Sequence, residues 1–371
     1  MKLRDARSID DLRDLARRRL PRMVFDYLDG GAEDEIALRA NRSAFETATL
    51  TGRVLRDISS VSTETTILGE TISAPVIIAP TAASRLFHPR AGERAVAAAA
   101  NDAGLPYAVS TLATTRFSDI ATIQSGPKWL QLYVWRDEAL VDQMLDDALA
   151  AGFTALILTV DTPVAGKRER DPRNGFSIPP KVNLKTATQA LARPRYLLDV
   201  ATSSKIVPAN VPKPAEGLDI MAFINSQFDP GVDWSYLERL VARWPGPVLV
   251  KGIAHPDDGL RALDIGAAGI WVSNHGGRQL GQSPATLDLL PPIRAAVGSE
   301  ATVILDGGIR RGSHIAIALD RGANAVAIGR PYLYGLAAAG SNGVAKALDI
   351  LRLEYELALS LTGQSQSLTQ P

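Results

Sequence analysis

The 371-residue sequence has no cysteine, no excess of either charge and no long apolar run. Without cysteine it has no disulfides, no thiolate metal sites and no cysteine nucleophile. Basic and acidic side chains number 40 each, whereas general nucleic-acid binders usually carry a basic excess. The apolar runs reach only about six to eight residues, which is too short for a transmembrane helix.

The N-terminus also lacks the features of a signal peptide. Lys2, Arg4, Asp5 and Arg7 are charged and no apolar run follows them. We therefore expect a cytoplasmic protein with no transmembrane segment, no nucleic-acid partner and no bound metal. Hydrophobic residues make up 46% of the chain, which is enough for a sizeable core in one large domain or two ordinary ones.

Eight short apolar runs alternate with Ala-rich stretches that have helical character. Continuous apolar runs are typical of parallel strands that are buried on both faces. Their regular spacing predicts an α/β fold, a (β/α)₈ TIM barrel over about residues 75–335, in preference to a doubly wound open sheet. The predicted strands are 75–79, 106–110, 129–133, 155–159, 248–251, 269–273, 302–306 and 325–329, and the helices include 91–104, 137–151, 256–267 and 312–322.

Two segments lie outside this repeat. Residues 9–28 predict an N-terminal helical segment in which Pro21 starts a second helix, and residues 50–70 predict short strands and turns. A long insertion, about residues 177–235, follows the fourth strand. An insertion of this length is usually an excursion over the active-site face, so it is either a partly mobile lid or a surface elaboration without a role.

Polar residues occupy the carboxyl ends of all eight predicted strands, where TIM barrels place their active sites. This convergence is hard to explain by structure alone. Gly308 and Arg310 follow the seventh strand, and Gly329 and Arg330 follow the eighth, which is the usual phosphate site of the fold. The other strand ends carry Pro80 and Thr81; Ser110; Gln131 and Tyr133; Thr159 and Asp161; Lys251; and Ser273.

His275 lies between a strand end and two glycines, with Arg278 three residues later. A histidine can accept a proton near neutral pH, and an arginine can bind a carboxylate through two hydrogen bonds. Asp161 is placed to hold the imidazole in one tautomer. Together they predict proton abstraction from a carboxylate-bearing substrate. Of the other histidines, His255 and His314 are assigned structural roles, and His88 lies in a loop after the first strand.

Lys251 ends the fifth strand, deep in the barrel mouth. It could form a Schiff base, as in an aldolase, or neutralise a negative charge that develops on a cofactor ring. A non-catalytic flavin- or phosphate-binding protein is a further alternative.

The segment 273–280, Ser-Asn-His-Gly-Gly-Arg-Gln-Leu, resembles the signature of the FMN-dependent 2-hydroxy acid oxidases and dehydrogenases, which include glycolate oxidase, lactate oxidase and mandelate enzymes. The resemblance covers nearly the whole chain, which implies one domain over residues 1–371. The other matching segments are 25–32, 79–82, 131–133, 159–163 and 305–312.

The resemblance implies FMN as cofactor and assigns a role to each matching residue. His275 would be the base, oriented by Asp161, while Arg278 and Arg168 would bind the substrate carboxylate. Tyr27 and Tyr133 would hydrogen-bond the substrate. The implied FMN-binding residues are Pro80, Thr81, Ala82, Ser110, Gln131, Thr159, Lys251, Ser273, Asp306, Gly308, Arg310, Gly329 and Arg330.

Departures from the family pattern bear on the substrate. Leu112 stands where glycolate oxidase has a tryptophan, and Ala165 stands where it has a leucine. Smaller side chains there would widen the pocket, and residues 85–89 are similar to hydroxymandelate oxidases. We therefore expect oxidation of a bulky or aromatic (S)-2-hydroxy acid, such as mandelate, in preference to glycolate.

Two resemblances bear on the electron acceptor, and they point in opposite directions. Ala82 resembles the oxygen-using members, whereas residues 193–200 resemble L-lactate dehydrogenases. We favour an oxidase that passes electrons to O₂ and yields H₂O₂, with a dehydrogenase that uses another acceptor as the alternative. The family also implies a homotetramer, although the chain ends soon after Gly363 and lacks the longer tail of some relatives.

Overall fold

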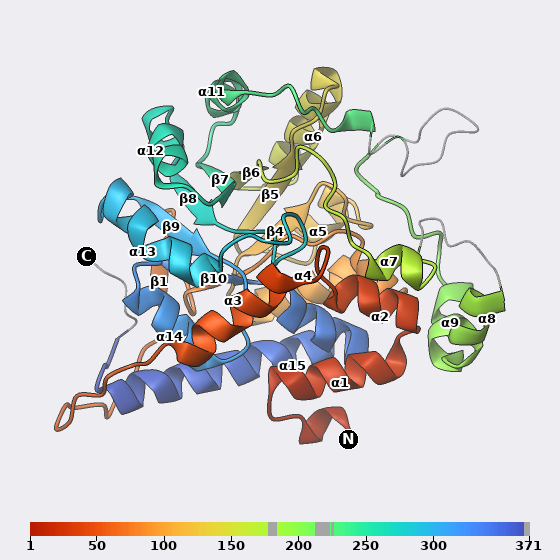
Figure 1. Cartoon of the computed structure of the whole chain (residues 1–371), viewed down its shortest axis with the longest axis horizontal. Helices are drawn as coiled ribbons and strands as arrows, with labels where there is room; N and C mark the ends of the chain where they lie inside the picture. The colour runs from red at the N-terminus through yellow and green to blue at the C-terminus, as the bar shows by residue number, and fades with distance from the viewer. Residues whose placement is uncertain (177–183, 212–222, 224–225, 367–371) are drawn as a thin grey trace.

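The computed structural model describes residues 1–176, 184–211, 223 and 226–366. Eight parallel strands close into a barrel, in the order β10-β3-β4-β5-β6-β7-β8-β9, and helices surround it (Figure 1). The predicted (β/α)₈ TIM barrel is confirmed, with small shifts at the strand ends. The strands are β3 (Val76–Ile78), β4 (Tyr107–Ser110), β5 (Lys128–Tyr133), β6 (Ala155–Thr159), β7 (Val248–Ile253), β8 (Gly269–Val272), β9 (Thr302–Leu305) and β10 (Ala325–Ile328).

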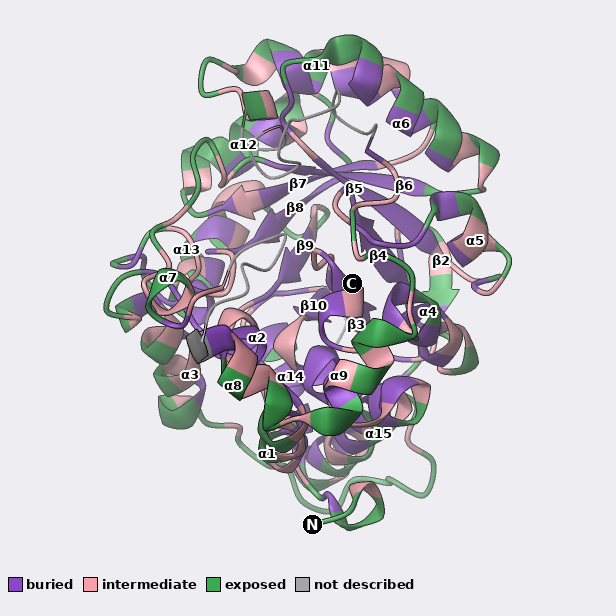
Figure 2. Ribbon diagram, turned by 90° about the vertical axis from the view of Figure 1, so that its right-hand side faces the viewer, coloured by how far each residue is buried: buried purple, intermediate pink, exposed green. Residues whose placement is uncertain are grey.

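The barrel strands are buried on both faces, which explains their continuous apolar runs. Side chains that point inward, among them Trp129, Ile157 and Trp271, form a core inside the barrel, and the opposite faces pack against the helices. Figure 2 shows the barrel strands in the colour of buried residues. The helices of the barrel units are α4 (Gly92–Asp102), α5 (Phe117–Ala121), α6 (Glu138–Ala150), α11 (Trp234–Arg243), α12 (Pro256–Asp264), α13 (Thr286–Val297), α14 (Gly312–Asp320) and α15 (Arg330–Thr362).

A hairpin closes the amino-terminal end of the barrel. Strands β1 (Thr65–Ile67) and β2 (Glu70–Ile72) pair antiparallel, and Ile67 and Ile72 pack into the inner core. The indole of Trp129, at the start of β5, donates to Glu70 at 3.1 Å. Because this end is filled, only the carboxyl end of the barrel is left for a site.

The N-terminal segment packs outside the barrel, where α1 contacts α15. The prediction of two helices around Pro21 is confirmed: Pro21 caps the second helix, and the side chain of Ser8 caps the first. The sequence interpretation missed α3 altogether. The elements are η1 (Leu3–Asp5), α1 (Ile9–Arg19), α2 (Arg22–Asp29) and α3 (Ile36–Thr47), and η2 (Ser84–Leu86) follows the first barrel strand.

The insertion after β6 carries α7 (Arg170–Arg173), α8 (Leu184–Leu191) and α9 (Pro194–Ala201). Its described part lies against the N-terminal helices: Gln189 accepts from the backbone of Met23, and Asp199 pairs with Arg19 at 2.7 Å. The hydroxyl of Tyr196 donates to the carbonyl of Leu86 at 2.8 Å. The predicted lid falls partly on residues 177–183, 212–222 and 224–225, which lie outside the described residues, and it stays a prediction.

Among the described residues, no helix is both long enough and apolar enough to cross a membrane.

Candidate active site

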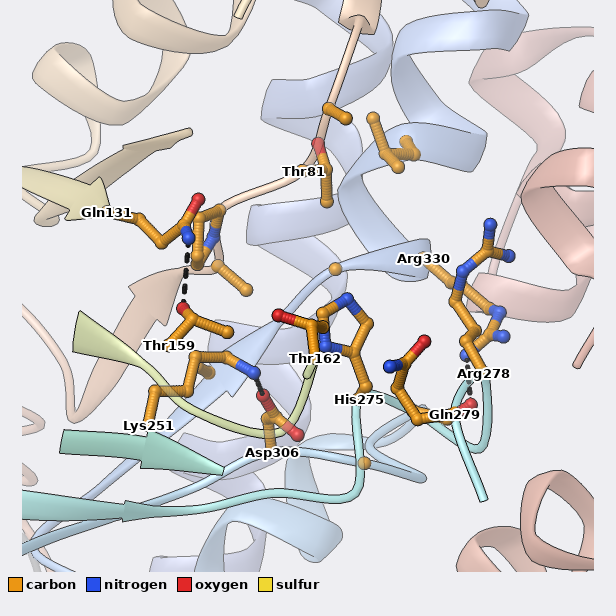
Figure 3. Close-up of a pocket in the computed structure, with 18 of the residues that line it drawn as sticks. Thr81, Gln131, Thr159, Thr162, Lys251, His275, Arg278, Gln279, Asp306 and Arg330 are labelled. Atoms are coloured by element: carbon orange, nitrogen blue, oxygen red, sulfur yellow. Dashed lines mark hydrogen bonds and ion pairs between the residues drawn. The ribbon is translucent and has the colours of Figure 1, made fainter. Parts of the chain in front are cut away.

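A cavity of about 240 Å³ opens at the carboxyl ends of the barrel strands. Figure 3 shows Gln131, Thr159 and Lys251 on one side of it, Arg278 and Arg330 on the other, and His275 between them. These side chains come from separate strands and loops, so only the closed barrel brings them together. The structure places nearly all of the predicted site residues in the lining, which includes Tyr27, Pro80, Thr81, Ala82, Leu112, Gln131, Tyr133, Thr159, Ala165, Arg168, Lys251, His275, Arg278, Asp306, Gly308, Arg310, Gly329 and Arg330.

His275 and Asp161 form the predicted pair. His275 Nδ1 lies 3.0 Å from Asp161 Oδ1, and the other ring nitrogen is left free of that carboxylate. The backbone of His275 is left-handed, with φ of +56°, and it leads into Gly276 and Gly277, which are also left-handed. This tight turn directs the imidazole into the cavity just beyond β8. A non-glycine residue rarely adopts this conformation, and such exceptions cluster at functional sites.

Strand β7 leaves room for Asp161 only because its residue 252 is glycine. Gly252 has φ of +109°, and a Cβ at this position would lie 2.7 Å from the Cβ of Asp161. Burial opposes the charge of Asp161, but His275 and Lys251 outweigh it and lower the pKa of this carboxyl. Asp161 is therefore ionised at neutral pH and can stabilise a positive charge on His275. Its Oδ2 atom is buried and has no hydrogen-bond partner among the residues that the structure describes.

Lys251 is buried at the base of the cavity and is held by Ser273 and Asp306. Its Nζ donates to Ser273 Oγ at 2.8 Å and lies 3.1 Å from Asp306 Oδ2. Burial opposes the ammonium charge, but Asp306 and Asp161 outweigh it, and the pKa of Lys251 is raised. A Schiff-base lysine needs a neutral amine, so this environment favours the role of a fixed positive charge over that of an aldolase nucleophile.

Gln131 presents an unpaired acceptor at the same end of the cavity. Its Nε2 donates to Thr159 Oγ1 at 2.9 Å, which fixes the direction of the amide. The Oε1 atom is buried and has no partner in the described part of the chain. An unpaired buried acceptor costs free energy, so this atom is suited to a ligand N–H group.

The other end of the cavity is built from glycines and arginines. Gly308 has φ of +84°, and a Cβ there would lie 2.0 Å from the carbonyl oxygen of Asn41, so only glycine fits. Arg310 is buried, and its Nε has no hydrogen-bond partner among the described residues. Arg330, at the start of α15, donates to the carbonyls of Leu28, Gly30 and Gly276. Burial lowers the pKa of Arg330 to about 10, so it remains charged and gains from a nearby anion.

His314 supports this glycine and arginine end. Its ring stacks on Phe45, with centroids 4.5 Å apart, and its Nδ1 accepts from the backbone of Arg310 at 3.2 Å. Burial lowers its pKa to about 4, so the ring is neutral at pH 7. The structural role predicted for His314 fits this position.

Arg278 and Arg168 line the cavity, and both lie near the ring of Tyr27. Their guanidinium carbons lie 4.9 and 5.9 Å from the centre of the Tyr27 ring. Arg278 donates to the carbonyl of Tyr27 at 2.7 Å, and Arg168 pairs with Asp171 at 3.1 Å. Burial and then the charge of Arg168 lower the pKa of Arg278. Two neighbouring like charges would both be stabilised by a carboxylate between them.

The wall of the cavity contains aromatic residues that the sequence interpretation missed. Phe228 lines the cavity and meets the ring of Tyr133 edge to face, with centroids 5.4 Å apart. Phe176 stacks on Tyr27 at 4.2 Å. Both come from the insertion, which has no periodic pattern that would place them. Phe228 is positioned by an isolated bridge to Trp135, where the N–H of Arg136 donates to the carbonyl of Gln227.

Gln279 was also missed, although it lies inside the signature segment. Its Nε2 donates to the carbonyls of Asp161 and Val164, and its Oε1 accepts from the N–H of Gly166. It thereby holds the loop that carries Asp161 and Ala165. Tyr133 lies nearby, and burial together with the charge of Asp161 raises the pKa of its hydroxyl, which stays protonated.

Two residues predicted to bind the cofactor lie behind the cavity wall. Ser110 Oγ accepts from the N–H of Leu112 at 3.1 Å, and Ser273 Oγ donates to Asp306 at 2.8 Å. Neither is among the lining residues, so the structure gives both a supporting position. Direct contact of Ser110 and Ser273 with a cofactor stays a prediction. Within the part of the chain that the structure describes, no cluster of His, Asp and Glu could hold a metal ion.

Comparison with known proteins identifies close relatives of the sequence. A model of the FMN-dependent dehydrogenase family matches residues 16–370. An L-lactate oxidase of Nostoc sp. is 42% identical over 95% of this chain and 93% of that protein. A putative L-lactate dehydrogenase of Mycobacterium tuberculosis is 41% identical over 96% of this chain and 86% of that protein. A peroxisomal (S)-2-hydroxyacid oxidase of Arabidopsis thaliana is 39% identical over 96% of this chain and 92% of that protein.

Solved structures show the same fold. An (S)-mandelate dehydrogenase, described as a monotopic membrane protein, superposes with a TM-score of 0.94 at 37% identity, and the match covers 99% of this chain and 97% of that one. A mandelate oxidase superposes with a TM-score of 0.84 at 39% identity over 97% and 96% of the two chains.

Proposed function

The chain belongs to the FMN-dependent dehydrogenase family, and from this premise we propose that it oxidises a bulky or aromatic (S)-2-hydroxy acid, such as mandelate, to the 2-oxo acid. In this proposal O₂ reoxidises the flavin and yields H₂O₂. As a member of the family the chain is an FMN-dependent oxidoreductase that acts on the CH–OH group of 2-hydroxy acids. The proposal adds the size of the substrate and the identity of the acceptor.

The residues present fit FMN. Gln131 offers a buried acceptor to a ring N–H, and Arg310 offers a buried donor to a phosphate oxygen; neither atom has a partner within the described part of the chain. Gly308 leaves the backbone open beside Arg310, and Arg330 adds a second positive charge there. Lys251 would face the ring as a fixed cation. When bound, FMN supplies the acceptor for the two electrons that leave the substrate.

The substrate carboxylate would lie between Arg278 and Arg168, where two guanidinium groups already repel each other. Both guanidinium groups lie near the ring of Tyr27 and would together fix the acid at one place in the cavity. This pairing holds the α-carbon within reach of His275 and turns a bimolecular encounter into an oriented one. The phenol of Tyr133, which stays protonated, can donate a hydrogen bond to the substrate.

His275 would take the proton that leaves the substrate. Its Nδ1 is committed to Asp161, so the remaining ring nitrogen is the one available as a base. Asp161 is ionised and stabilises the imidazolium that forms. The walls of the cavity, which include Leu112, Val164 and Phe228, limit the access of water to this proton.

An aromatic substituent on the substrate is supported by the apolar part of the cavity wall. Leu112, Ala165 and Phe228 line the cavity together, so they offer apolar and aromatic surface with little bulk at residue 165. A phenyl group that moves from water to this surface would contribute roughly 2 kcal/mol to substrate binding. Glycolate has no such group and therefore lacks this contribution.

Ala82 lies in the cavity wall and supports the oxidase proposal by its resemblance to oxygen-using members. The curated relatives include both an oxidase and dehydrogenases, so a dehydrogenase with another acceptor remains the second candidate, favoured by residues 193–200. The cytoplasmic location and the homotetramer are also part of the proposal. The relative of known structure with the TM-score of 0.94 is described as monotopic, which makes a membrane-bound location the alternative to test.

The observation that carries the proposal is that His275, which pairs with Asp161, lines the same cavity as Arg278 and Arg168. The test is the colour of the purified protein. We expect a yellow protein that bleaches when (S)-mandelate is added without air and regains its colour, with release of H₂O₂, when air is admitted. A yellow protein that no 2-hydroxy acid bleaches would contradict the proposal and indicate a flavin-binding protein without this activity.

A further inference from the structure

A second cavity, of about 400 Å³, lies apart from the active site and is lined mainly by arginine and hydroxyl side chains. Three segments form it: residues 85–94 at the start of α4, residues 114–119 before and within α5, and residues 202–209 after α9. These helices are labelled in Figure 2. The arginines in its lining are Arg85, Arg90, Arg94 and Arg116.

The positive charges of this cavity exceed the negative ones. Asp119 is the one carboxylate in the described lining, and it pairs with Arg94 at 3.0 Å. Arg90 pairs at 3.1 Å with Asp199, which also pairs with Arg19. No ion-pair partner of Arg116 occurs among residues 1–176, 184–211 and the other described positions. A chain with zero net charge thus concentrates positive charge at one hollow.

Arg85 forms the wall between two of the segments. Its guanidinium donates to the carbonyls of Pro89, Ser204 and Lys205, at 2.9, 2.7 and 3.3 Å. Burial lowers its pKa, and the nearby charge of Glu93 opposes this effect. Glu93 itself is buried and accepts from the hydroxyls of Thr114 and Thr115. The hydrogen bonds of the Glu93 carboxylate are therefore already satisfied, and it does not pair with the arginines of the described lining.

We propose that this cavity binds a phosphate-bearing ligand. The hydroxyls of Thr202 and Ser203 already donate to carbonyls of α9, and Arg90 donates to the hydroxyl oxygen of Thr202. The donors left for a ligand are therefore chiefly the guanidinium N–H groups of Arg94 and Arg116. Guanidinium groups match the oxygens of phosphate in pairs, and a phosphate monoester brings almost two negative charges and three acceptors. The volume admits a phosphate ester with a small organic group.

The same two segments of chain line both cavities. In the segment of residues 85–89, Phe87 lines the active site while Arg85 and Pro89 line the second cavity. In the segment of residues 112–114, Leu112 lines the active site while Thr114 lines the second cavity. A ligand that contacts the arginines would thus act on the wall that selects the substrate. Its expected effect is on the KM for the 2-hydroxy acid, with kcat nearly unchanged.

The phosphate could belong to a soluble ester or to the headgroup of an anionic lipid. Leu198 and Val200 on α9, just before the cavity, are exposed by 60% and 38%, and they could contact a lipid surface. The two sources share their chemistry, so the experiment has one arm for each.

The test uses the full chain saturated with FMN, so that the phosphate end of the active site is filled. Glycerol 3-phosphate is titrated by calorimetry at low salt, and vesicles of phosphatidylcholine with and without an anionic phospholipid are tested by sedimentation. The variant is Arg94→Gln with Arg116→Gln. The control is Arg352→Gln, because Arg352 pairs with Glu356 and is 51% exposed, as Arg94 is 55% exposed beside Asp119.

We expect saturable binding in at least one arm, about tenfold weaker in the double variant and unchanged in the control. Binding of the ester alone identifies a soluble ligand, and binding of anionic vesicles alone identifies a headgroup. Two outcomes overturn the proposal: no saturable binding in either arm, or equal binding by the double variant and the wild type. A change of oligomeric state in the double variant without a change in binding would also overturn it, because the arginines would then serve subunit contacts.

Discussion

The strand ends and the cavity wall of this protein are held in place by different forces. Lys251, Ser273, Asp306, His275 and Asp161 follow barrel strands and are fixed to one another by short hydrogen bonds and ion pairs. The wall is made of apolar and aromatic side chains that loops and the insertion carry; Leu112, Ala165 and Phe228 are examples, and packing positions them. In the proposed function this difference separates two tasks: the strand ends would perform the chemistry, and the wall would select the substrate.

The comparison implies that changes at the strand ends lower the rate for every substrate, whereas changes in the wall alter the ratio between substrates. Removal of one partner from a buried polar network leaves unpaired groups, which is costly. Replacement of one apolar side chain by another changes mainly contact area, and this amounts to about 1 to 3 kcal/mol for a hydrophobic pocket.

The largest effect is expected from His275→Ala, which removes the proposed base from the strand ends. We expect kcat to fall by about 10³-fold with every 2-hydroxy acid, because a positioned general base contributes about 10² to 10⁴. The protein should stay yellow, since the other groups suited to FMN remain in place. Stopped-flow reduction of the flavin measures this rate. The control is His255→Ala, which removes an exposed histidine outside the cavity and should leave the rate unchanged.

The next largest effect is expected from Arg278→Lys. Lysine keeps the charge but loses the planar pair of donors and the contact with the Tyr27 ring. We expect kcat/KM to fall roughly 30-fold for large and small acids alike, since the carboxylate is common to all of them. Steady-state assays with mandelate and lactate measure the two values. A loss confined to mandelate would place Arg278 in the wall instead of the chemical centre.

A third prediction concerns Asp29, at the end of the α2 helix that carries Tyr27. Burial opposes its charge, but Arg13 and Tyr334 outweigh this and lower its pKa to about 2, from an ordinary value of 3.8. Because the folded pKa is the lower one, Asp29 stabilises the fold above about pH 4 and loses this contribution as the pH falls through 2.

We expect Asp29→Asn to lower the free energy of unfolding at pH 7 by about 2 kcal/mol. The difference from wild type should shrink as the pH falls from 4 toward 2. Urea unfolding at several pH values measures it. The exposed residue Asp10 provides the control as Asp10→Asn, for which a small and pH-independent change is expected.

The smallest effect is expected from Leu112→Trp in the wall. A larger ring at this position narrows the cavity, so kcat/KM for mandelate should fall about tenfold while that for glycolate stays the same or rises. Phe228→Leu should act in the same direction by removing an aromatic contact. The ratio of the two kcat/KM values is the readout, and an equal loss for both substrates would show that the wall also serves the chemistry.

The two regions also differ in how far sequence reasoning reaches. The strand ends could be located because a (β/α)₈ barrel converts eight positions in the sequence into one ring of side chains. His275 and Asp161 were predicted to meet, and they lie 3.0 Å apart. The left-handed turn at His275 also agrees with the two glycines that follow it.

The wall was less predictable. Phe228 and Phe176 lie in the insertion, where no periodic pattern relates sequence position to place in the fold. They reach the site only through tertiary contacts, such as the bridge between Phe228 and Trp135. Ser110 and Ser273 are predicted to contact the cofactor; their hydroxyls hydrogen-bond to Leu112 and Asp306, and direct contact with a cofactor stays a prediction. The direction of a side chain at a strand end depends on its neighbours in the fold. The spacing of residues in the sequence does not specify these neighbours.

The most direct test of the division between strand ends and wall is the kcat/KM of the wild-type enzyme for (S)-mandelate, L-lactate and glycolate, measured under the same conditions. We expect the highest kcat/KM for mandelate, because Leu112 and Ala165 in the wall leave room for a phenyl group beside Phe228. A higher kcat/KM for glycolate or lactate would contradict this account.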